Sequence, residues 1–211
     1  MKHKFPYRLY LVLSEDTCPK GNFPDVAEQA IEGGADIIQL REKTADTALF
    51  LEKALRLQER LSKYQVPLII NDNLAVALQS SAFGIHVGNS DVSPQHIRSV
   101  WKDCPSLGYS IEYLEQLEND DTQVSDCLGI SPVFQTLTKK DTVTEWGLQG
   151  IRNIRNLTDK PLVAIGNMNV RNVYEVIKAG ADCIAVVSAI CSADNPAKAA
   201  YEIRNQIEKA I

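Results

Sequence analysis

Charged and amide side chains follow directly after several short apolar runs of this sequence. The run Ile37–Leu40 leads into Arg41, Glu42 and Lys43 with no turn residue between, and a later run ends at Asn71 and Asp72. Apolar runs of this length are typical of buried strands. If the strands are parallel, their carboxyl ends meet at one edge of the sheet, so the polar side chains would gather in one place. The pattern predicts a site there.

Three cations suit a ligand that carries more than one phosphate. Arg41 offers a planar fork of donors, while Lys43 and Lys139 each offer a point charge. A di- or triphosphate is the ligand class that these residues predict. The alternative is a rim of solvated charges, which is the commoner fate of a single lysine. Glu42 points the other way along the strand and is expected only to orient a neighbour.

Two carboxylates follow neighbouring predicted strands. Asp72 comes directly after one strand, and Asp91 lies a few residues after the next. Mg²⁺ is usually held by one or two carboxylates, and phosphate oxygens complete its coordination. Asp72 and Asp91 are therefore predicted to bind Mg²⁺. The alternative is that Asp72 caps a helix beginning at Asn73 and that Asp91 closes a turn before Pro94.

A second anion position is predicted after the last two strands. Gly166 and Ser188 follow them, where barrels often hold a phosphate monoester on backbone N–H groups. His86 lies within a predicted strand and is expected to be a packed or supporting residue and not a base. The sequence offers no arrangement typical of nucleophilic catalysis. These features favour chemistry driven by a leaving group.

Eight apolar runs alternate with eight helix-patterned stretches. The expected strands cover 8–13, 36–40, 67–71, 83–87, 106–110, 126–130, 161–165 and 182–187. The expected helices cover 24–33, 46–63, 73–80, 94–102, 111–118, 146–156, 169–179 and 195–210. Strict alternation implies parallel strands, because each parallel pair needs a crossover helix. The number eight and the lack of a polar edge strand favour a (β/α)₈ TIM barrel and not an open doubly wound sheet. We therefore expect residues 1–211 to form a single α/β domain.

The helix starts are expected at Thr44 or Asp46, at Ser93-Pro94 and at Asn169. The long irregular stretch 131–145 is expected to be functional, as a lid over the site.

The composition narrows the classes of partner. A chain of 211 residues with a formal net charge of −5 does not suit broad binding of nucleic acid or anionic membranes. None of its apolar stretches approaches the ~20 residues of a membrane span, and the short run "LYLVL" is interpreted as a first strand. Five scattered cysteines predict reduced thiols and a cytoplasmic protein. The sequence leaves open whether the chain forms a homo-oligomer.

Segments spread over nearly the whole chain resemble the thiamine-phosphate synthase (thiamine-phosphate pyrophosphorylase) family. They are "IIQLREK" (37–43), "LIINDNLAVAL" (68–78), "GIHVGNSD" (84–91), "LGYS" (107–110), "PVFQTLTKKDT" (132–142), "VAIGNMNVRNV" (163–173) and "IAVVSAI" (184–190). The resemblance implies a barrel that joins hydroxymethylpyrimidine diphosphate to a thiazole phosphate, with Mg²⁺ as cofactor and diphosphate as the second product.

The resemblance also assigns roles to residues. It implies that Gln39, Arg41, Lys43, Asn71, Ser110 and Lys139 hold the pyrimidine diphosphate, and that Arg41, Lys43 and Lys139 stabilise the leaving group. Asp72 and Asp91 would ligate Mg²⁺. Thr136, Thr138, Gly166, Val187 and Ser188 would hold the thiazole phosphate. The chain departs from the family at Asn167, where a second glycine is common. Asn tolerates a left-handed backbone, so we expect the turn to persist.

Three alternatives stand beside this function, and only the last belongs to another functional class. A thiazole tautomerase would share the barrel, but such relatives usually lose the acidic pair and the T-x-T-K segment that this chain keeps. A sugar-phosphate isomerase or epimerase would need an acid–base pair, which the sequence does not offer. A non-catalytic barrel that senses thiamine phosphate would bind its ligand and release no diphosphate.

Overall fold

Eight parallel strands close into a barrel in a computed structural model of the chain, which describes residues 5–136 and 144–211. The strands follow one another around the barrel in chain order, and β8 pairs with β1. They are β1 Leu9–Leu13, β2 Ile37–Leu40, β3 Leu68–Asn71, β4 Gly84–Val87, β5 Ser106–Ile111, β6 Cys127–Ile130, β7 Leu162–Ala164 and β8 Cys183–Val186. This confirms the predicted (β/α)₈ TIM barrel, and each predicted strand is present within about one residue at either end.

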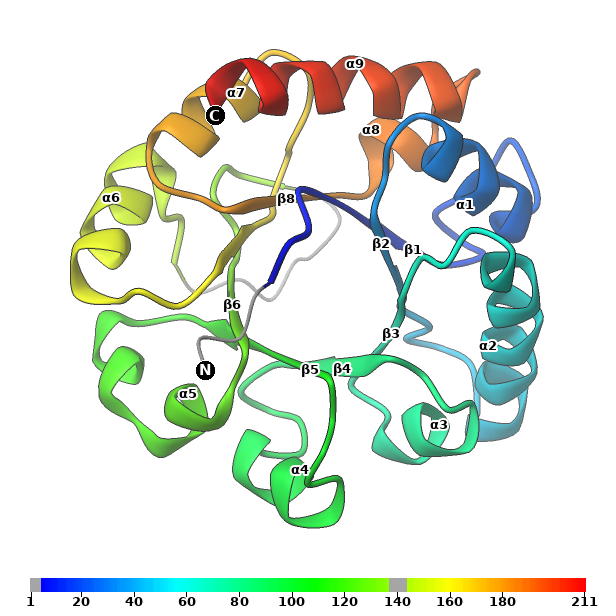
Figure 1. Ribbon diagram of the computed structural model, residues 1–211, viewed down its shortest axis with the longest axis horizontal. Helices are drawn as coiled ribbons and strands as arrows, with labels where there is room; N and C mark the ends of the chain where they lie inside the picture. The colour runs from blue at the N-terminus through cyan, green and yellow to red at the C-terminus, as the bar shows by residue number, and fades with distance from the viewer. Residues whose placement is uncertain (1–4, 137–143) are drawn as a thin grey trace.

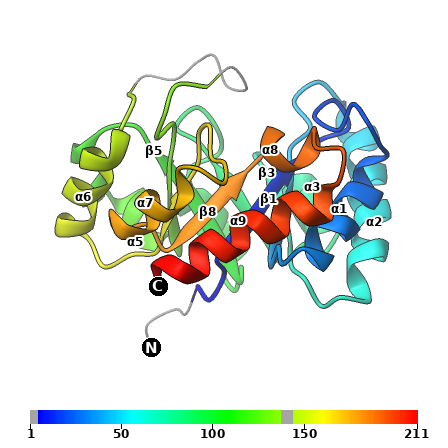
Figure 2. The ribbon, with the colours of Figure 1, turned by 90° about the horizontal axis from the view of Figure 1, so that it is seen from above.

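Helices surround the barrel (Figure 1). They are α1 Phe23–Glu32, α2 Thr47–Ser62, α3 Leu74–Gln79, α4 Pro94–Val100, the 3₁₀ helix η1 Leu114–Glu118, α5 Asp120–Val124, α6 Gly147–Leu157, α7 Val173–Lys178, α8 Ser188–Cys191 and α9 Pro196–Ala210. The last long helix, α9, packs between α7 and α1, so the last helix closes the ring beside the first helix (Figures 1 and 2).

The alternation of side chains along each strand separates two apolar clusters. Leu11, Ile38 and Ile70 face the helices and are fully buried, as both faces of a parallel sheet require. Each such side chain contributes about 1.5–3 kcal/mol by leaving water. A smaller cluster inside the barrel includes Tyr10 and Ile37. The inward positions nearer the carboxyl ends are more polar, and they form the site described below.

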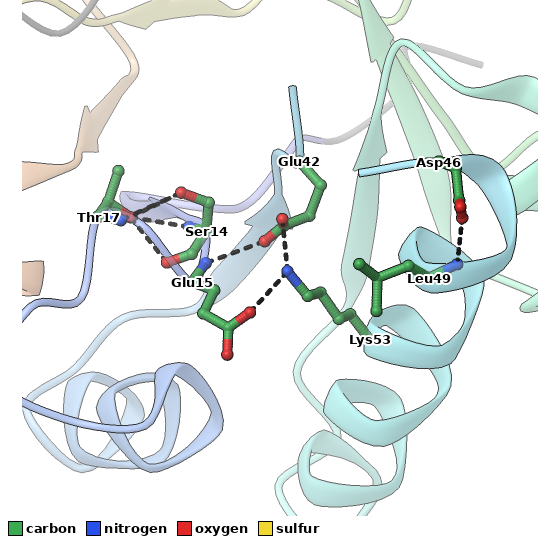
Figure 3. A network of polar contacts seen from close by, with 7 residues as sticks. All are labelled: Ser14, Glu15, Thr17, Glu42, Asp46, Leu49 and Lys53. Atoms are coloured by element: carbon green, nitrogen blue, oxygen red, sulfur yellow. Dashed lines mark hydrogen bonds and ion pairs between the residues drawn. The ribbon is translucent and has the colours of Figure 1, made fainter. Parts of the chain in front are cut away.

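Short polar residues begin several helices as predicted. The Asp46 side chain accepts a hydrogen bond from Leu49 N at 2.8 Å and starts α2 (Figure 3). Ser93 accepts from His96 N at 3.3 Å, and Pro94 opens α4. The start predicted at Asn169 is wrong, because Asn172 is the cap of α7 and Asn169 lies in the preceding turn.

The helix predicted over 111–118 is present only in part, as a 3₁₀ helix that begins at Leu114. β5 continues to Ile111, and η1 and α5 follow it as two short pieces. Side chains that bond to the backbone explain the break. Gln116 Oε1 accepts the N–H groups of Glu112 and Tyr113, and Asn119 Oδ1 accepts Thr122 N at 2.7 Å. The four-residue helix α8 was not predicted.

The five cysteines are all buried and free, as expected for reduced thiols. Within the described ranges, no helix has the length and apolar character needed to cross a membrane.

Candidate active site

A cavity of about 600 Å³ opens at the carboxyl ends of the strands. Every predicted site residue that the structure describes lines this cavity. They are Gln39, Arg41, Lys43, Asn71, Asp72, Asp91, Ser110, Thr136, Gly166, Val187 and Ser188. Thr138 and Lys139 lie outside the described residues, so their predicted roles stay predictions, as does the lid expected over 131–145.

The side chains at the end of β2 point alternately into the cavity and away from it. Gln39, Arg41 and Lys43 line the cavity. Glu42 lies between them in the sequence but is buried behind the strand, with its side chain only 3% exposed. Its carboxylate accepts Glu15 N at 2.9 Å and pairs with Lys53 Nζ at 2.8 Å (Figure 3). Glu42 therefore orients its neighbours, as the sequence predicted.

Lys53 links β2 to the loop that follows β1. Its Nζ lies 2.8 Å from Glu15 as well as from Glu42 (Figure 3). Burial alone would lower the pKa of Lys53, but its hydrogen bonds to Glu15 and Glu42 outweigh this and raise the pKa above its usual value. The same loop carries Ser14 and Thr17, which line the cavity and bond to each other, with Ser14 N donating to Thr17 Oγ1 at 2.8 Å. The ion pairs thus fix one wall of the cavity.

The two predicted metal ligands lie together. Burial raises the pKa of Asp72, and a contact with the Asp91 carboxyl group raises it further, although Lys43 Nζ lies 2.8 Å from Asp72 Oδ2. Asp91 Oδ2 accepts Gly88 N at 2.8 Å, so Asp91 also closes the turn before Pro94. Asp72 does not cap α3, because Asn73 does so by accepting Val76 N at 3.0 Å. The capping alternative is therefore wrong for Asp72.

Asp72 and Asp91 offer oxygen ligands that could hold Mg²⁺. Two partly buried carboxylates that approach each other are held at an electrostatic cost, and a bound cation would relieve it. Two protein carboxylates with phosphate oxygens are a usual set for Mg²⁺. Among the described residues, no group of three or more His, Cys, Asp and Glu side chains could hold a metal. The chain's own ligands would thus need a phosphorylated ligand to complete the set.

Hydrogen-bonded pairs form the floor of the cavity. Gln39 Nε2 donates to the buried Tyr10 hydroxyl at 2.9 Å. His86 Nε2 lies 2.8 Å from Ser110 Oγ. Both Tyr10 and His86 line the cavity, but Tyr10 was not predicted as a site residue and His86 was expected only as a packed or supporting residue. Both residues occupy strand positions that face the inside of the barrel. The sequence shows which positions face inward only when the register of the strands is known.

The opposite wall is built around a left-handed turn after β7. Gly166 has φ +114°, and a Cβ there would lie 2.7 Å from Pro132 Cβ, so only glycine fits. Asn167 follows with φ +55°, which confirms that the turn persists without a second glycine. Val187 and Ser188, at the start of α8, line the cavity beside this turn.

Residues 9–190 match the family model described as "Thiamine monophosphate synthase". The chain belongs to this family. A thiamine-phosphate synthase of Albidiferax ferrireducens is 43% identical over 95% of this chain and 92% of its own length. One from Leptospira biflexa is 42% identical over 94% of this chain and 96% of its own. A solved structure of thiamine phosphate pyrophosphorylase from Pyrococcus furiosus is 31% identical, covers 97% of both chains and has a TM-score of 0.87.

The match to the thiamine monophosphate synthase family spans every element that contributes to the cavity, from β1 to α8. Both walls and the floor therefore fall within the shared part of the chain, and the resemblance drawn from the sequence is confirmed.

Proposed function

We propose that this protein is a thiamine-phosphate synthase. It would join hydroxymethylpyrimidine diphosphate to a thiazole phosphate and release thiamine phosphate and diphosphate. The observation that carries the proposal is that two chemically different walls line one cavity, each suited to an anion. Cations and carboxylates line the side of β2 to β4, while hydroxyls and a glycine turn line the side of β6 to β8. Two phosphorylated substrates in one cavity need such a division.

The diphosphate would bind beside Arg41 and Lys43. Arg41 suits a bidentate contact with phosphate oxygens, and Lys43 can turn from Asp72 to the ligand because its side chain is half exposed. Asn71 lies at the end of β3 and would donate its amide N–H. We expect Lys139 to add a third cation. These groups stabilise the charge that grows on the departing diphosphate.

Asp72 and Asp91 would hold Mg²⁺ together with the diphosphate oxygens. When bound there, the ion neutralises part of the leaving group's charge. The thiazole phosphate would lie at the other wall, on Thr136, Thr138, the Gly166 turn, Val187 and Ser188. Anchoring the thiazole by its phosphate places its ring nitrogen towards the pyrimidine methylene and makes bond formation effectively unimolecular.

The reaction needs no enzymatic base. The bond between the pyrimidine methylene carbon and the diphosphate oxygen breaks, and its electron pair leaves with the diphosphate. The thiazole nitrogen then gives its lone pair to the methylene carbon. Gln39 and Ser110 lie below the cations and would orient the pyrimidine ring. The chain's net charge of −5 fits small-molecule substrates, and no nucleic acid or membrane partner is proposed. The five free, buried cysteines fit a cytoplasmic enzyme.

The acidic pair argues against a thiazole tautomerase. Such an enzyme binds no diphosphate, so a costly pair of facing carboxylates beside Lys43 would serve no purpose in it. A sensing barrel would keep the pair but would turn over no substrate.

The test is an assay of diphosphate release by the purified protein. With both substrates and Mg²⁺, release should occur, and it should stop when either the thiazole phosphate or Mg²⁺ is omitted. Asp91→Ala should lose ~10²-fold or more in kcat, while remaining folded at the temperature of the assay. A folded parent protein that releases no diphosphate would leave the sensor and tautomerase alternatives.

A further inference from the structure

We infer that His86 is a positioning residue that fixes the Ser110 hydroxyl as a hydrogen-bond acceptor for the pyrimidine's amino group. This inference rests on the proposed function. It starts from the 2.8 Å separation of His86 Nε2 and Ser110 Oγ at the floor of the cavity. A serine hydroxyl has one proton, so its single donated bond decides what its lone pairs can do.

The position of the imidazole is fixed by two glycines. His86 in β4 pairs in register with Gly108 in β5, and Ser110 pairs with Gly129 in β6. A Cβ on Gly108 would lie 2.3 Å from His86 Nδ1, and one on Gly129 would lie 2.9 Å from His86 Cε1. The ring therefore fills the space that two side chains would occupy and reaches across β5. Three strands combine to bring Nε2 to Ser110.

The depth of the cavity sets the orientation of the substrate. The cations and carboxylates lie beyond the ends of β2 to β4, so the diphosphate stays near the opening. Its pyrimidine ring must then point inward, towards Gln39, Ser110 and the Tyr10 hydroxyl. Among these groups, Gln39 lies on β2 and Ser110 lies on β5, three strands further round the barrel, so Ser110 reaches the ring from a different side.

The direction of the Ser110 proton follows from the chemistry of the amino group. When the Ser110 hydroxyl donates its hydrogen bond to His86 Nε2, both hydroxyl lone pairs are available to an N–H of the pyrimidine's amino group. Positive charge spreads onto the amino nitrogen as the diphosphate departs, so this hydrogen bond becomes charge-assisted and strengthens. The chain from amino group to Ser110 to His86 then polarises as a unit. Only hydrogen bonds change in this step, and no proton is transferred.

A matched pair of variants tests the positioning role. His86→Gln can present an amide group near the place of Nε2, whereas His86→Asn reaches only about as far as Nδ1. We expect His86→Asn to lower kcat by ~10- to 100-fold, with a smaller change in the KM for the pyrimidine diphosphate. His86→Gln should recover a large part of the activity. Combining His86→Asn with Ser110→Ala should cost no more than Ser110→Ala alone.

Other outcomes would overturn the inference. Equal losses in both His86 variants, or losses that multiply with Ser110→Ala, would mean that His86 acts independently of Ser110. A second measurement does not depend on turnover. The ¹⁵N spectrum of the histidine rings in the parent protein should show Nε2 of His86 without a proton, with a signal that moves in Ser110→Ala. A protonated Nε2 would reverse the proposed direction. A parent that releases no diphosphate would instead overturn the proposed function.

Discussion

Lys43 Nζ lies 2.8 Å from Asp72 Oδ2. The lysine predicted to bind the diphosphate is thus paired with a carboxylate predicted to bind the metal ion. The pair crosses from the end of β2 to the end of β3. A diphosphate with a metal ion would compete for both partners at once, since it brings anionic oxygens for the lysine and a cation for the carboxylate. Until such a ligand binds, Lys43 and Asp72 partly neutralise each other's charge in the cavity.

Asp72 gives a prediction about stability and pH. Burial and Asp91 raise the pKa of Asp72 in the folded protein above its unfolded value of about 3.9. The stabilising contribution of a raised pKa is complete below the unfolded value and is lost as the pH rises through the folded value. Asp72→Asn should therefore gain thermal stability over the parent at pH 7, and this advantage should shrink towards pH 4. Its activity should be lost.

The backbone at Asp72 provides the control for this experiment. Its φ of +63° lies in the left-handed region, where Asn is accommodated at least as readily as Asp, so Asn can also stabilise the variant through the backbone. That gain does not depend on pH, whereas the ionisation effect does. Melting temperatures across pH 4–8 separate the two. A constant difference at every pH would show that the Asp72 carboxylate is held at no electrostatic cost.

Several strand ends could be predicted because the apolar run stops abruptly at a polar residue, as at Leu13-Ser14 and Leu40-Arg41. Because polar residues at the strand ends also line the cavity, the same pattern predicted both the fold and part of the site. His86 and Tyr10 were not assigned because a side chain's direction in a barrel depends on register. The room for His86 depends on Gly108 and Gly129, in strands 20 or more residues away along the chain. The break after Ile111 escaped prediction because Gln116 and Asn119 compete locally for backbone N–H groups.

Asn167 is predicted to matter through its backbone and not through its exposed side chain. With φ at +55°, Asn167→Ala should lower the free energy of unfolding by about 1 kcal/mol, because alanine disfavours this conformation more than asparagine does. Asn167→Gly should be as stable as the parent or slightly more so. Denaturant unfolding measures both. The KM for the thiazole phosphate should be little changed in Asn167→Gly, and a large fall in that KM would mean that the side chain obstructs the phosphate.

Lys53 is predicted to support the site from behind. Lys53→Met leaves the buried Glu42 carboxylate without its cation and should destabilise the protein by about 3 kcal/mol. The loop with Ser14 and Thr17 would lose one of its attachments, so both KM values should rise. Adding Glu42→Gln removes the unpaired charge and should restore part of the stability. If the double variant is no more stable than Lys53→Met, the buried charge is not the source of the loss.

Mg²⁺ and diphosphate are predicted to bind cooperatively. Because no third His, Cys, Asp or Glu among the described residues joins Asp72 and Asp91 in a metal-binding group, Mg²⁺ alone should raise the melting temperature little. Inorganic diphosphate alone should also have a small effect, since Lys43 is engaged by Asp72. Together they should stabilise by about 2.7 kcal/mol at 100 times the dissociation constant, which is several degrees for a chain of this size. Asp91→Asn controls for the complex that forms in free solution, because that complex is the same for both proteins. An equal shift in Asp91→Asn would show that the diphosphate binds through the cations alone and that the acidic pair holds no metal.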